Sequence, residues 1–245
     1  MKYLSLILLF TCFTVSSFAQ VNQKDSQGRK QGVWKKPYPQ NAVFRYVGQF
    51  KDDKPYGKFV YYYETGEVEA VIQFKSNGVS YSKMYHRSGY MMARGKYIDQ
   101  KKDSTWVYYD DRGVVSYQED YLKGDLHGQK VVYYEPVNGE YRIMEYSYWK
   151  NGLQHGEYKK YHPSKKLAEE GNFVDGNKEG IIKHYYPSGK LARLERYKYG
   201  VKHGYWIFYD KDGKQEGYHL YWEGVRLKGE ALKKKEAELK AEKNK

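Results

Sequence analysis

A short motif recurs along this chain about every 24 residues, and it constrains the fold more than any other feature. Each copy begins with a glycine or a serine, and a tyrosine follows five residues later. The starting residues are Gly57, Ser80, Ser104, Gly128, Gly156, Gly180 and Gly204, and their tyrosines are Tyr62, Tyr85, Tyr109, Tyr133, Tyr161, Tyr185 and Tyr209. An eighth, degenerate copy opens with Gly32 and Trp34. A fixed period of this length predicts an array in which each unit packs on its neighbours.

One unit has the pattern of a β-hairpin. Residues 59–63 are aromatic or β-branched, which suits a pleated strand, and the run ends at Glu64-Thr65-Gly66. Glycine there can adopt the positive φ that a tight turn requires, and residues 67–74 then form the return strand. Because a single two-stranded hairpin is marginal in water, we expect all the units to form one domain, residues 20–227.

Three units depart from the pattern. The unit that starts at Gly128 carries extra residues at 135–140, which predicts a longer hairpin. The unit that starts at Gly156 has Pro163-Ser164-Lys165 where a turn glycine is expected. The unit that starts at Ser80 also has Ser82 in place of an aromatic residue. Each departure is tolerable within a repeat.

The composition favours a single layer of sheet over a thick aliphatic core. Tyrosine makes up 30 of the 245 residues, and the mean hydropathy is −0.95. Such a sheet can pack tyrosine and tryptophan on one face and carry charges on the other, since the polar tips of these rings still reach water. The chain is therefore predicted to be all-β, an elongated antiparallel sheet of about eight hairpins. The repeat aromatics are predicted to pack the sheet, with a binding face as the alternative, and they are Trp34, Tyr62, Tyr85, Trp106, Tyr109, Tyr133, Tyr161, Tyr185, Trp206 and Tyr209.

The units resemble MORN repeats, and more narrowly the bacterial antitoxin-like MORN variant, here with an N-terminal export signal. The resemblance rests on the Gly-x-Trp/Tyr starts, the tyrosine pairs and the Gly-x-x-His-Gly junctions that contain His127, His155 and His203. It covers residues 28–227 and implies a twisted antiparallel sheet of hairpins. It is compatible with scaffolds, lipid-surface binders and protein-docking modules. An antitoxin-like partner of a toxin is a further, remote alternative.

The N-terminus has the pattern of a signal peptide, residues 1–19. Lys2 supplies a positive charge, residues 4–10 are apolar, and small residues precede a predicted cut between Ala19 and Gln20. The alternative is a lipoprotein signal in which Cys12, the single cysteine, carries the lipid. We therefore expect export to the periplasm, the outer membrane or the exterior. The apolar run is too short to span a membrane, so no transmembrane segment is expected in the mature chain.

The charge favours anionic partners. Without the leader the chain has 42 basic and 30 acidic residues, a formal charge of +12. Residues 228–245 form a lysine-rich tail of good helix formers with few apolar anchors, which we expect to be helical or disordered and solvated. Anionic lipid or an acidic protein would suit these lysines. Nucleic acid is not an expected partner, because the repeat accounts for the aromatics and the leader directs the chain away from it.

No pattern of catalytic chemistry stands out. The histidines before the start glycines repeat with the units, so we interpret them as junction residues. No His-Glu-x-x-His, Cys-x-x-Cys or phosphate-loop motif occurs in the sequence. We therefore predict no catalytic residue, cofactor or metal, and a non-enzymatic role.

The most direct functional hypothesis is a secreted or envelope scaffold for a protein partner. The alternative is a surface binder of glycan or anionic lipid. The two hypotheses differ in what they require of the surface. A scaffold needs a contiguous apolar or aromatic strip, whereas a ligand binder needs a local concavity with convergent polar groups.

Overall fold

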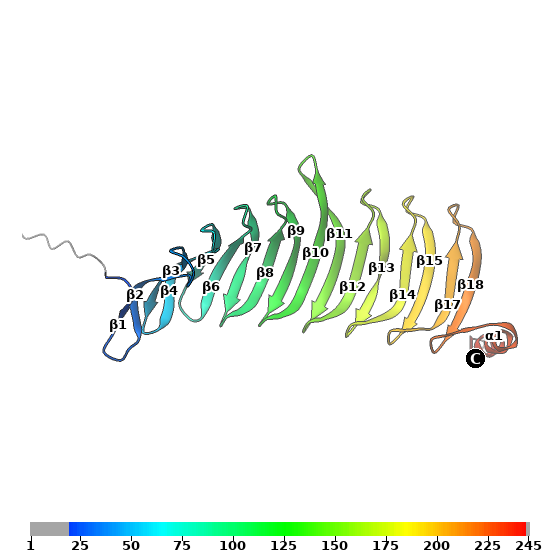
Figure 1. Ribbon diagram of the computed structural model, residues 1–245. Coiled ribbons are helices and arrows are strands. Elements are labelled where there is room, and N and C mark those ends of the chain that lie inside the picture. The colour runs from blue at the N-terminus through cyan, green and yellow to red at the C-terminus, as the bar shows by residue number, and fades with distance from the viewer. Residues whose placement is uncertain (1–19, 244–245) are drawn as a thin grey trace, which may run out of the picture.

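The computed structural model describes residues 20–243 and contains one open antiparallel sheet of 19 strands followed by one helix (Figure 1). This confirms the predicted all-β repeat fold. The strands pair in chain order, except that β16 and β17 both pair with β15. The predicted leader lies outside the described residues, together with Ala19 and Cys12, so its removal stays a prediction.

The first ten strands are β1 (Gln23–Lys24), β2 (Lys30–Pro37), β3 (Phe44–Lys51), β4 (Lys54–Tyr62), β5 (Val68–Phe74), β6 (Val79–Tyr85), β7 (Met91–Ile98), β8 (Lys101–Tyr109), β9 (Val115–Leu122) and β10 (Asp125–Val137). The remaining elements are β11 (Glu140–Lys150), β12 (Leu153–Tyr161), β13 (Leu167–Val174), β14 (Asn177–Tyr185), β15 (Leu191–Lys198), β16 (Val201–Lys202), β17 (Gly204–Tyr209), β18 (Gln215–Trp222), β19 (Val225–Leu227) and α1 (Gly229–Lys243). The lysine-rich tail thus forms α1.

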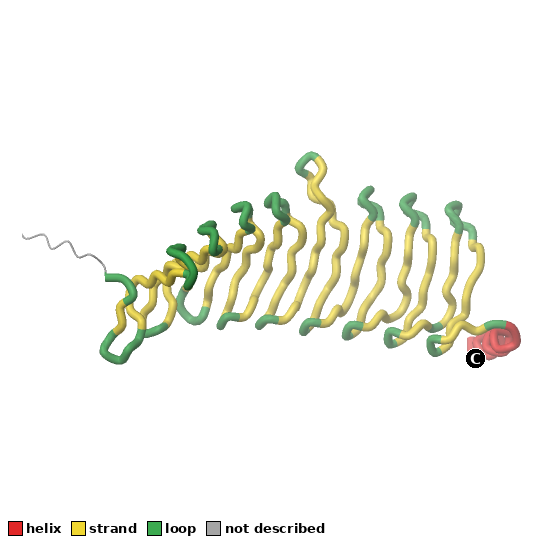
Figure 2. Tube along the Cα trace, in the orientation of Figure 1, coloured by secondary structure: helices red, strands yellow, loops and turns green. Residues whose placement is uncertain are grey.

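The strands lie side by side in a twisted ribbon, with β1 near one end and α1 at the other (Figure 1). Loops occur along both long edges of the ribbon (Figure 2). We call the edge that holds the turn of Gly66 the tip edge, and the edge where one unit passes into the next the junction edge. The hairpin of β10 and β11 extends beyond the other tips (Figure 1), as predicted from its extra residues.

Most turns at the tip edge share one hydrogen-bond pattern, and those of the β2–β3 and β10–β11 hairpins differ. In the hairpin of β4 and β5, the N–H of Gly66 donates to the carbonyl of Tyr63, whose own N–H donates to the carbonyl of Glu67. Gly66 has a φ of 100°. In the hairpin of β12 and β13, Lys165 takes the glycine's place with a φ of 66° and keeps the pattern. This turn therefore holds a lysine in a conformation that favours glycine.

Turns at the junction edge are two-residue hairpin turns, except the four-residue turn between β5 and β6. Asn151 and Gly152 both have positive φ, the geometry of a type I′ turn, which matches the twist of the flanking strands. The second residue of such a turn also bonds to the preceding unit. The N–H of Gly176 donates to the carbonyl of Gln154, and the N–H of Gly200 donates to that of Lys178. From the turn between β7 and β8 to the turn between β18 and β19, each junction is thus bonded to the one before it.

The start residues mark bulges in the ladder. Gly57 and Ser104 have φ values of 67° and 58°, and the register shifts next to each of them. A bulge with a left-handed residue bends the strand and increases its twist. Ser80 lacks a positive φ, and the pairing of β5 with β6 shows no register shift. The loss of the start glycine in that unit is thus matched by a regular ladder.

A buried row of side chains follows the sheet, two residues after the start of most units. Trp106 is 0% exposed, and Phe59, Tyr158, Ile182 and Trp206 are buried too. Glycines of neighbouring strands make room for them. A Cβ added to Gly95 would lie 2.2 Å from the ring of Trp106, and one added to Gly48 would lie 2.2 Å from the ring of Phe59. A small residue on one strand thus admits a large one on the next.

In the unit with Ser82 the small residue is in the row and the large residue is on the adjacent strand. Ser82 pairs with Ile72 of the preceding return strand, at a level where other units have glycine. In the unit from Gly128 the corresponding residue is Lys130, whose Nζ lies 2.9 Å from Oε1 of the buried Glu119. At Ser82 the larger Ile72 fills the space that a bulky residue would take, and at Lys130 the charge is paired with Glu119. Both residues are therefore compatible with the buried row.

Side chains at the tip edge tie each unit to the next. In most units the residue six positions after the start bonds to the backbone carbonyl of the next unit's repeat tyrosine, and Asp110 is an exception. Tyr134 Oη donates to Tyr161, and Tyr186 Oη donates to Tyr209, both at 2.7 Å. His162 Nε2 lies 3.0 Å from the Tyr185 carbonyl. These bonds satisfy carbonyl groups that would otherwise end a strand unpaired.

The glycines beneath the buried row should be intolerant of even one methyl group. We expect Gly95→Ala to destabilise the protein by about 1–3 kcal/mol, since the new Cβ overlaps the Trp106 ring. Gly217→Ala is the matched control, because nothing lies within 4 Å of its added Cβ and its φ is not positive. Thermal unfolding measures both. Equal melting temperatures for the two variants would contradict the packing argument.

The turn of Lys165 should be improved by glycine. The related turn in the hairpin of β14 and β15 has Pro187, Ser188 and Gly189 where this one has Pro163, Ser164 and Lys165. We expect Lys165→Gly to raise stability by about 0.5–1 kcal/mol, because the strained left-handed lysine is removed and its exposed ion pair with Glu140 contributes little. The mirror variant Gly189→Lys should lower the melting temperature. If Lys165→Gly melted at a lower temperature than wild type and Gly189→Lys at a higher one, the left-handed strain at Lys165 would be refuted.

Candidate functional site

The aromatic residues occupy both faces of the sheet. Trp34, Trp106 and Trp206 share one face with Phe59 and Tyr158, which we call the aromatic face. The tyrosines five residues after each start lie on the opposite face, since side chains alternate along a strand. All seven are half-buried and they are Tyr62, Tyr85, Tyr109, Tyr133, Tyr161, Tyr185 and Tyr209. The expected division into one aromatic and one charged face is therefore wrong.

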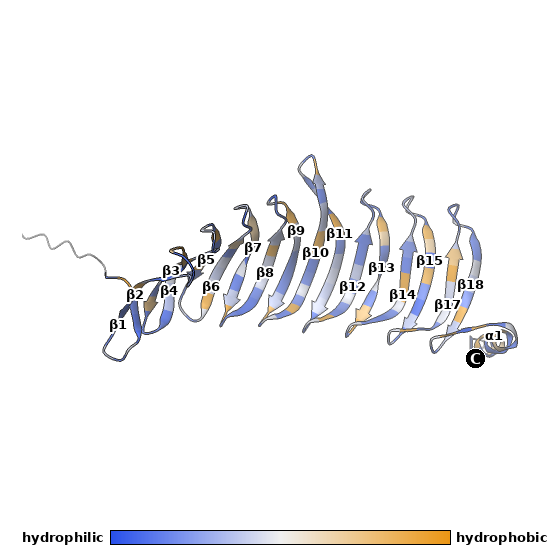
Figure 3. Ribbon diagram, viewed as in Figure 1, coloured by the Kyte–Doolittle hydropathy of each residue, from blue (hydrophilic) through white to orange (hydrophobic). Residues whose placement is uncertain are grey.

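The tyrosines of the opposite face bond to polar neighbours. Tyr185 Oη donates to Glu170 Oε1 at 2.7 Å, and Gln118 Nε2 donates to Tyr133 Oη at 3.0 Å. Burial and the bond to Glu170 raise the pKa of Tyr185 to about 12. These rings are thus held within the sheet. Apolar and polar residues are mixed along the strands of the whole array (Figure 3).

Lysine ammonium groups lie over rings of the aromatic face, near the junction edge. Lys102 Nζ is 4.8 Å from the centre of the Trp106 ring, and it donates a hydrogen bond of 2.7 Å to Tyr108 Oη. Lys202 Nζ is 4.6 Å from the centre of the Trp206 ring. Lys30 and Lys178 stand two residues before a start, as Lys102 and Lys202 do, and also lie over rings. The aromatic face therefore carries a row of lysines whose ammonium groups lie over aromatic rings.

An ionic cluster centred on the buried Glu195 and the half-buried His184 crosses three strands of the same face. His184 lies between two carboxylates, with Nδ1 3.4 Å from Glu169 Oε2 and Nε2 3.2 Å from Glu195 Oε2. Arg193 Nε is 2.7 Å from Glu195 Oε1. Tyr158 Oη donates to Glu169 Oε1 at 2.6 Å. The cluster joins β13, β14 and β15, so its charges link two units.

The charges of this cluster support one another. Burial alone would lower the pKa of His184, but the bonds to Glu169 and Glu195 outweigh it and raise that pKa above its ordinary 6.5. The bond from His184 is the main reason that the pKa of Glu169 falls to about 2. Burial opposes the charge of Glu195, yet His184 and the Arg193 guanidinium hold its pKa below the ordinary range.

The histidines of the junctions bond to the next junction or pack there. His155 Nδ1 lies 3.1 Å from Asp175 Oδ1, and His127 Nδ1 lies 3.3 Å from Asn151 Oδ1. The ring of His203 packs on Trp222, with 4.4 Å between the centres. Within residues 20–243, no group of three or more His, Cys, Asp or Glu side chains is placed to hold a metal ion. The junction interpretation accounts for the positions of all three histidines.

An exposed apolar strip follows the junction edge of the opposite face. It consists of Leu122, Leu153, Val174, Val201 and Val225, and all five are exposed, Leu153 at 50% and Val225 at 64%. The strip is continuous with the junction turns. A Cβ on Gly176 would lie 3.7 Å from Leu153, and one on Gly224 would lie 3.3 Å from Val201. Leu153 and Val201 therefore reach the turn of the following unit.

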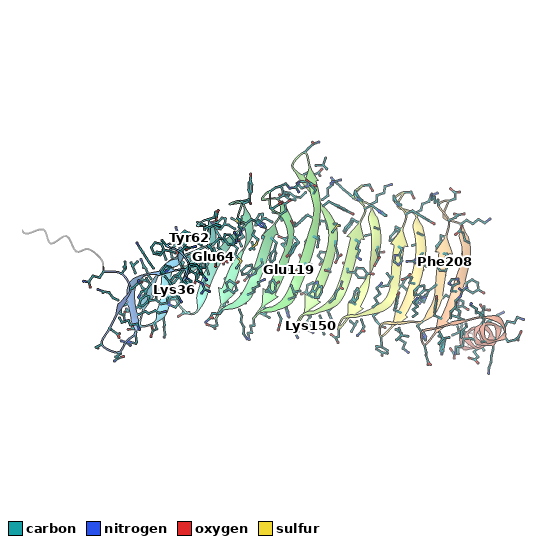
Figure 4. The ribbon with its side chains drawn as sticks, viewed as in Figure 1. Lys36, Tyr62, Glu64, Glu119, Lys150 and Phe208 are labelled. Atoms are coloured by element: carbon teal, nitrogen blue, oxygen red, sulfur yellow. The ribbon has the colours of Figure 1, made fainter. Side chains whose placement is uncertain are left out.

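The strip runs from the unit that starts at Ser104 to the last unit of the array. Leu153 and Val201 stand three residues before a start, where the N-terminal half has the exposed Lys54 and Lys101. Lys150 adjoins the strip at the same edge (Figure 4). Because the lysines and the apolar residues fit the same backbone, folding does not demand the apolar ones. Large exposed apolar residues gathered on one surface mark an interaction site.

A family model described as a MORN repeat variant matches three segments of the chain. The segments are residues 55–76, 154–175 and 178–199. Each begins two residues before a start glycine and covers one hairpin up to the next junction turn. The resemblance to MORN repeats is thus confirmed for these three units. Among curated proteins no match to the chain is found.

Two features of the site, the role of the second tyrosine of each pair and the apolar strip, could not be predicted from the repeat motif alone. The tyrosine pairs were evident, but the role of the second member, exemplified by Tyr134 and Tyr186, depends on the carbonyl of the next unit. Leu153 and Val201 were visible inside two Gly-x-x-His-Gly junctions. Their alignment into a strip requires the register of the sheet. The repeat aromatics named from the sequence lie on two faces and do not converge on one site.

The cluster around His184 predicts a pH dependence of stability. Because the folded-state pKa of His184 is raised, its contribution is complete below about pH 6.5 and is lost as the pH rises through the folded-state pKa. The contribution of Glu169 is present above about pH 4.5 and is lost as the pH falls toward 2. We expect the melting temperature of wild type to exceed that of His184→Gln at pH 6, and the difference to shrink by pH 9.

The difference in melting temperature between wild type and His184→Gln should be roughly 2–4 °C for each kcal/mol of stability that the histidine contributes. His162→Gln is the control, because its histidine faces the Tyr185 carbonyl and not a carboxylate in the described structure. A difference between wild type and His184→Gln that stays constant from pH 6 to pH 9 would rule out an ionic role for His184.

Proposed function

We propose that the protein is an exported, non-enzymatic repeat protein of a bacterial cell envelope that acts as a scaffold for a protein partner. The observation that carries this proposal is the apolar strip of Leu122, Leu153, Val174, Val201 and Val225. Repeats of the matched kind commonly bind proteins or membranes and generally lack catalytic activity. The scaffold needs no cofactor.

The shape of the strip favours a macromolecular partner. Its five residues span five successive units, and at about 4.8 Å per strand this corresponds to roughly 40 Å. The side chains stand in a line along an open edge, so a partner must present an equally long surface. Lys150 and Lys198 at the same level supply the polar rim that protein interfaces have around an apolar centre.

Export is the second part of the proposal and rests on the sequence. A leader of residues 1–19 with a cut between Ala19 and Gln20 would release the array into the envelope or beyond it. A lipid on Cys12 is the alternative mode of attachment. In the described part of the chain, α1 is the single helix, and it lacks the length and apolar character to cross a membrane.

A second candidate function is binding to a glycan or an anionic lipid surface. The row of Lys30, Lys102, Lys178 and Lys202 on the aromatic face favours it, because cations backed by rings suit an anionic or sugar-bearing surface. This row faces away from the apolar strip. The two functions would therefore use different faces and can be separated by mutation.

Affinity capture from the native envelope tests the scaffold. The baits are the chain without its leader, the strip variant Leu153→Asp/Val201→Asp, and the control Lys54→Asp/Lys101→Asp, which alters the same repeat position outside the strip. We expect wild type and control to retain one or two defined proteins at moderate salt, and the strip variant to retain at least tenfold less. Recovery of polysaccharide or lipid alone, lost as salt rises, would favour the second candidate instead.

A further inference from the structure

The C-terminal helix α1 lies beside the last unit of the array (Figure 1), and its contacts with Tyr218 and Trp222 place it against the opposite face. Tyr218 Oη donates to Glu236 Oε1 at 2.7 Å, and Lys235 Nζ lies 3.5 Å from the centre of the Trp222 ring. Leu220, on the same face of β18, is 0% exposed. Few apolar anchors are present in α1, so its position depends on these polar and cation–π contacts.

A cleft of about 600 Å³ remains between α1 and the strands β15, β17 and β18. Tyr205, Trp222 and Leu239 form its apolar wall. The Trp222 ring contacts both Lys235 and the ring of His203, so its position in the wall is set by contacts within this molecule. A volume of this size suits a ligand of a few amino-acid residues.

Three cations converge on the cleft without a counter-ion. They are Arg196 from β15 and Lys240 and Lys243 from α1, and none of them forms an ion pair with any residue between 20 and 243. Other lysines of α1 are paired, as Lys235 is with Glu238. The carboxylate that lines the cleft belongs to Glu236, and it already accepts the bond from Tyr218. The cleft is therefore positively charged around an apolar wall.

We propose that this cleft binds an acidic peptide segment of a protein partner. Carboxylates of the segment pair with Arg196, Lys240 and Lys243, in bonds that are stronger because both groups are charged. An aliphatic or aromatic side chain between the carboxylates packs on Trp222 and Tyr205. The contact of Glu236 with Tyr218 shows within this molecule how a carboxylate on a helix meets this face of the sheet.

The position of the cleft favours a peptide over a small anion. Val201 and Val225, the last two residues of the apolar strip, flank the strands that form it, and Trp222 pairs with Val225 across β18 and β19. A polypeptide bound along the strip can thus continue into the cleft, whereas a free phosphate would leave the apolar wall uncovered. The inference rests on the proposed scaffold function and specifies the chemistry of the partner.

The test measures the fluorescence anisotropy of a short fluorescein-labelled peptide of alternating glutamate and leucine. A peptide with glutamine in place of glutamate is the matched probe. The cleft variant is Arg196→Glu/Lys240→Glu, and the control is Lys211→Glu/Lys234→Glu, which makes the same charge change on exposed residues outside the cleft. Thermal unfolding establishes that both variants fold.

We expect the wild-type protein and the control to bind the glutamate peptide, and the cleft variant to bind it at least about tenfold more weakly. The glutamine peptide should bind wild type and control more weakly than the glutamate peptide does, and the cleft variant should show no preference for glutamate. Equal affinity of wild type and cleft variant, or no preference for glutamate, would overturn the proposal. So would binding of inorganic phosphate or phosphatidylglycerol vesicles through Arg196 and Lys240 in the absence of peptide binding.

The strip variant Leu153→Asp/Val201→Asp separates this inference from the scaffold function. If a captured protein depends on the strip but binds the cleft variant as well as wild type, the cleft proposal fails and the scaffold stands. If no protein depends on the strip while the glutamate peptide still requires Arg196 and Lys240, the scaffold function fails and the cleft remains an acidic-peptide site.

Discussion

The fit of a bulky side chain against a small residue of the adjacent strand is the interaction on which this structure depends. One hairpin is marginal by itself, and a single-layer sheet has no second layer to bury its rings. The rings of Trp106 and Phe59 instead lie over Gly95 and Gly48, which brings them into close packing within the sheet. Because each ring and its glycine come from successive units, stability belongs to the contacts between units.

This dependence leaves other positions free to vary. The buried row tolerates Ser82 because Ile72 fills the space, and it tolerates Lys130 because Glu119 pairs with it. Outward positions at the junction edge are under no such constraint, so lysine at one unit can be replaced by leucine or valine at another. The array can therefore carry apolar residues at this position in some units and lysines in others without a change of fold.

The repeat period made the architecture predictable. The glycine turns, the longer hairpin at residues 135–140 and the all-β class follow from local residue types that the chain shows every 24 residues. Even the irregular turn at Lys165 keeps the backbone of its neighbours, since its hydrogen bonds are the same. Local patterns of this kind depend only on residues close in sequence.

The candidate sites were much less predictable, because they depend on neighbours one unit away. The faces of the repeat tyrosines required the strand register, and the apolar strip required the alignment of Leu153 with Val174 and Val201 across units. The docking of α1 was not evident, since its few apolar residues suggested a solvated helix. Its contacts are made by Lys235 and Glu236, charged residues whose partners Trp222 and Tyr218 lie in the last hairpin.

Hydrogen exchange along the intact chain, followed by mass spectrometry, tests most directly whether contacts between units hold the array together. If they do, amides of the interior strands β5 to β15 should exchange slowly and at similar rates, and exchange should quicken only toward β1 and β19. Hairpins that open one at a time, with widely different rates in the interior of the array, would contradict this account.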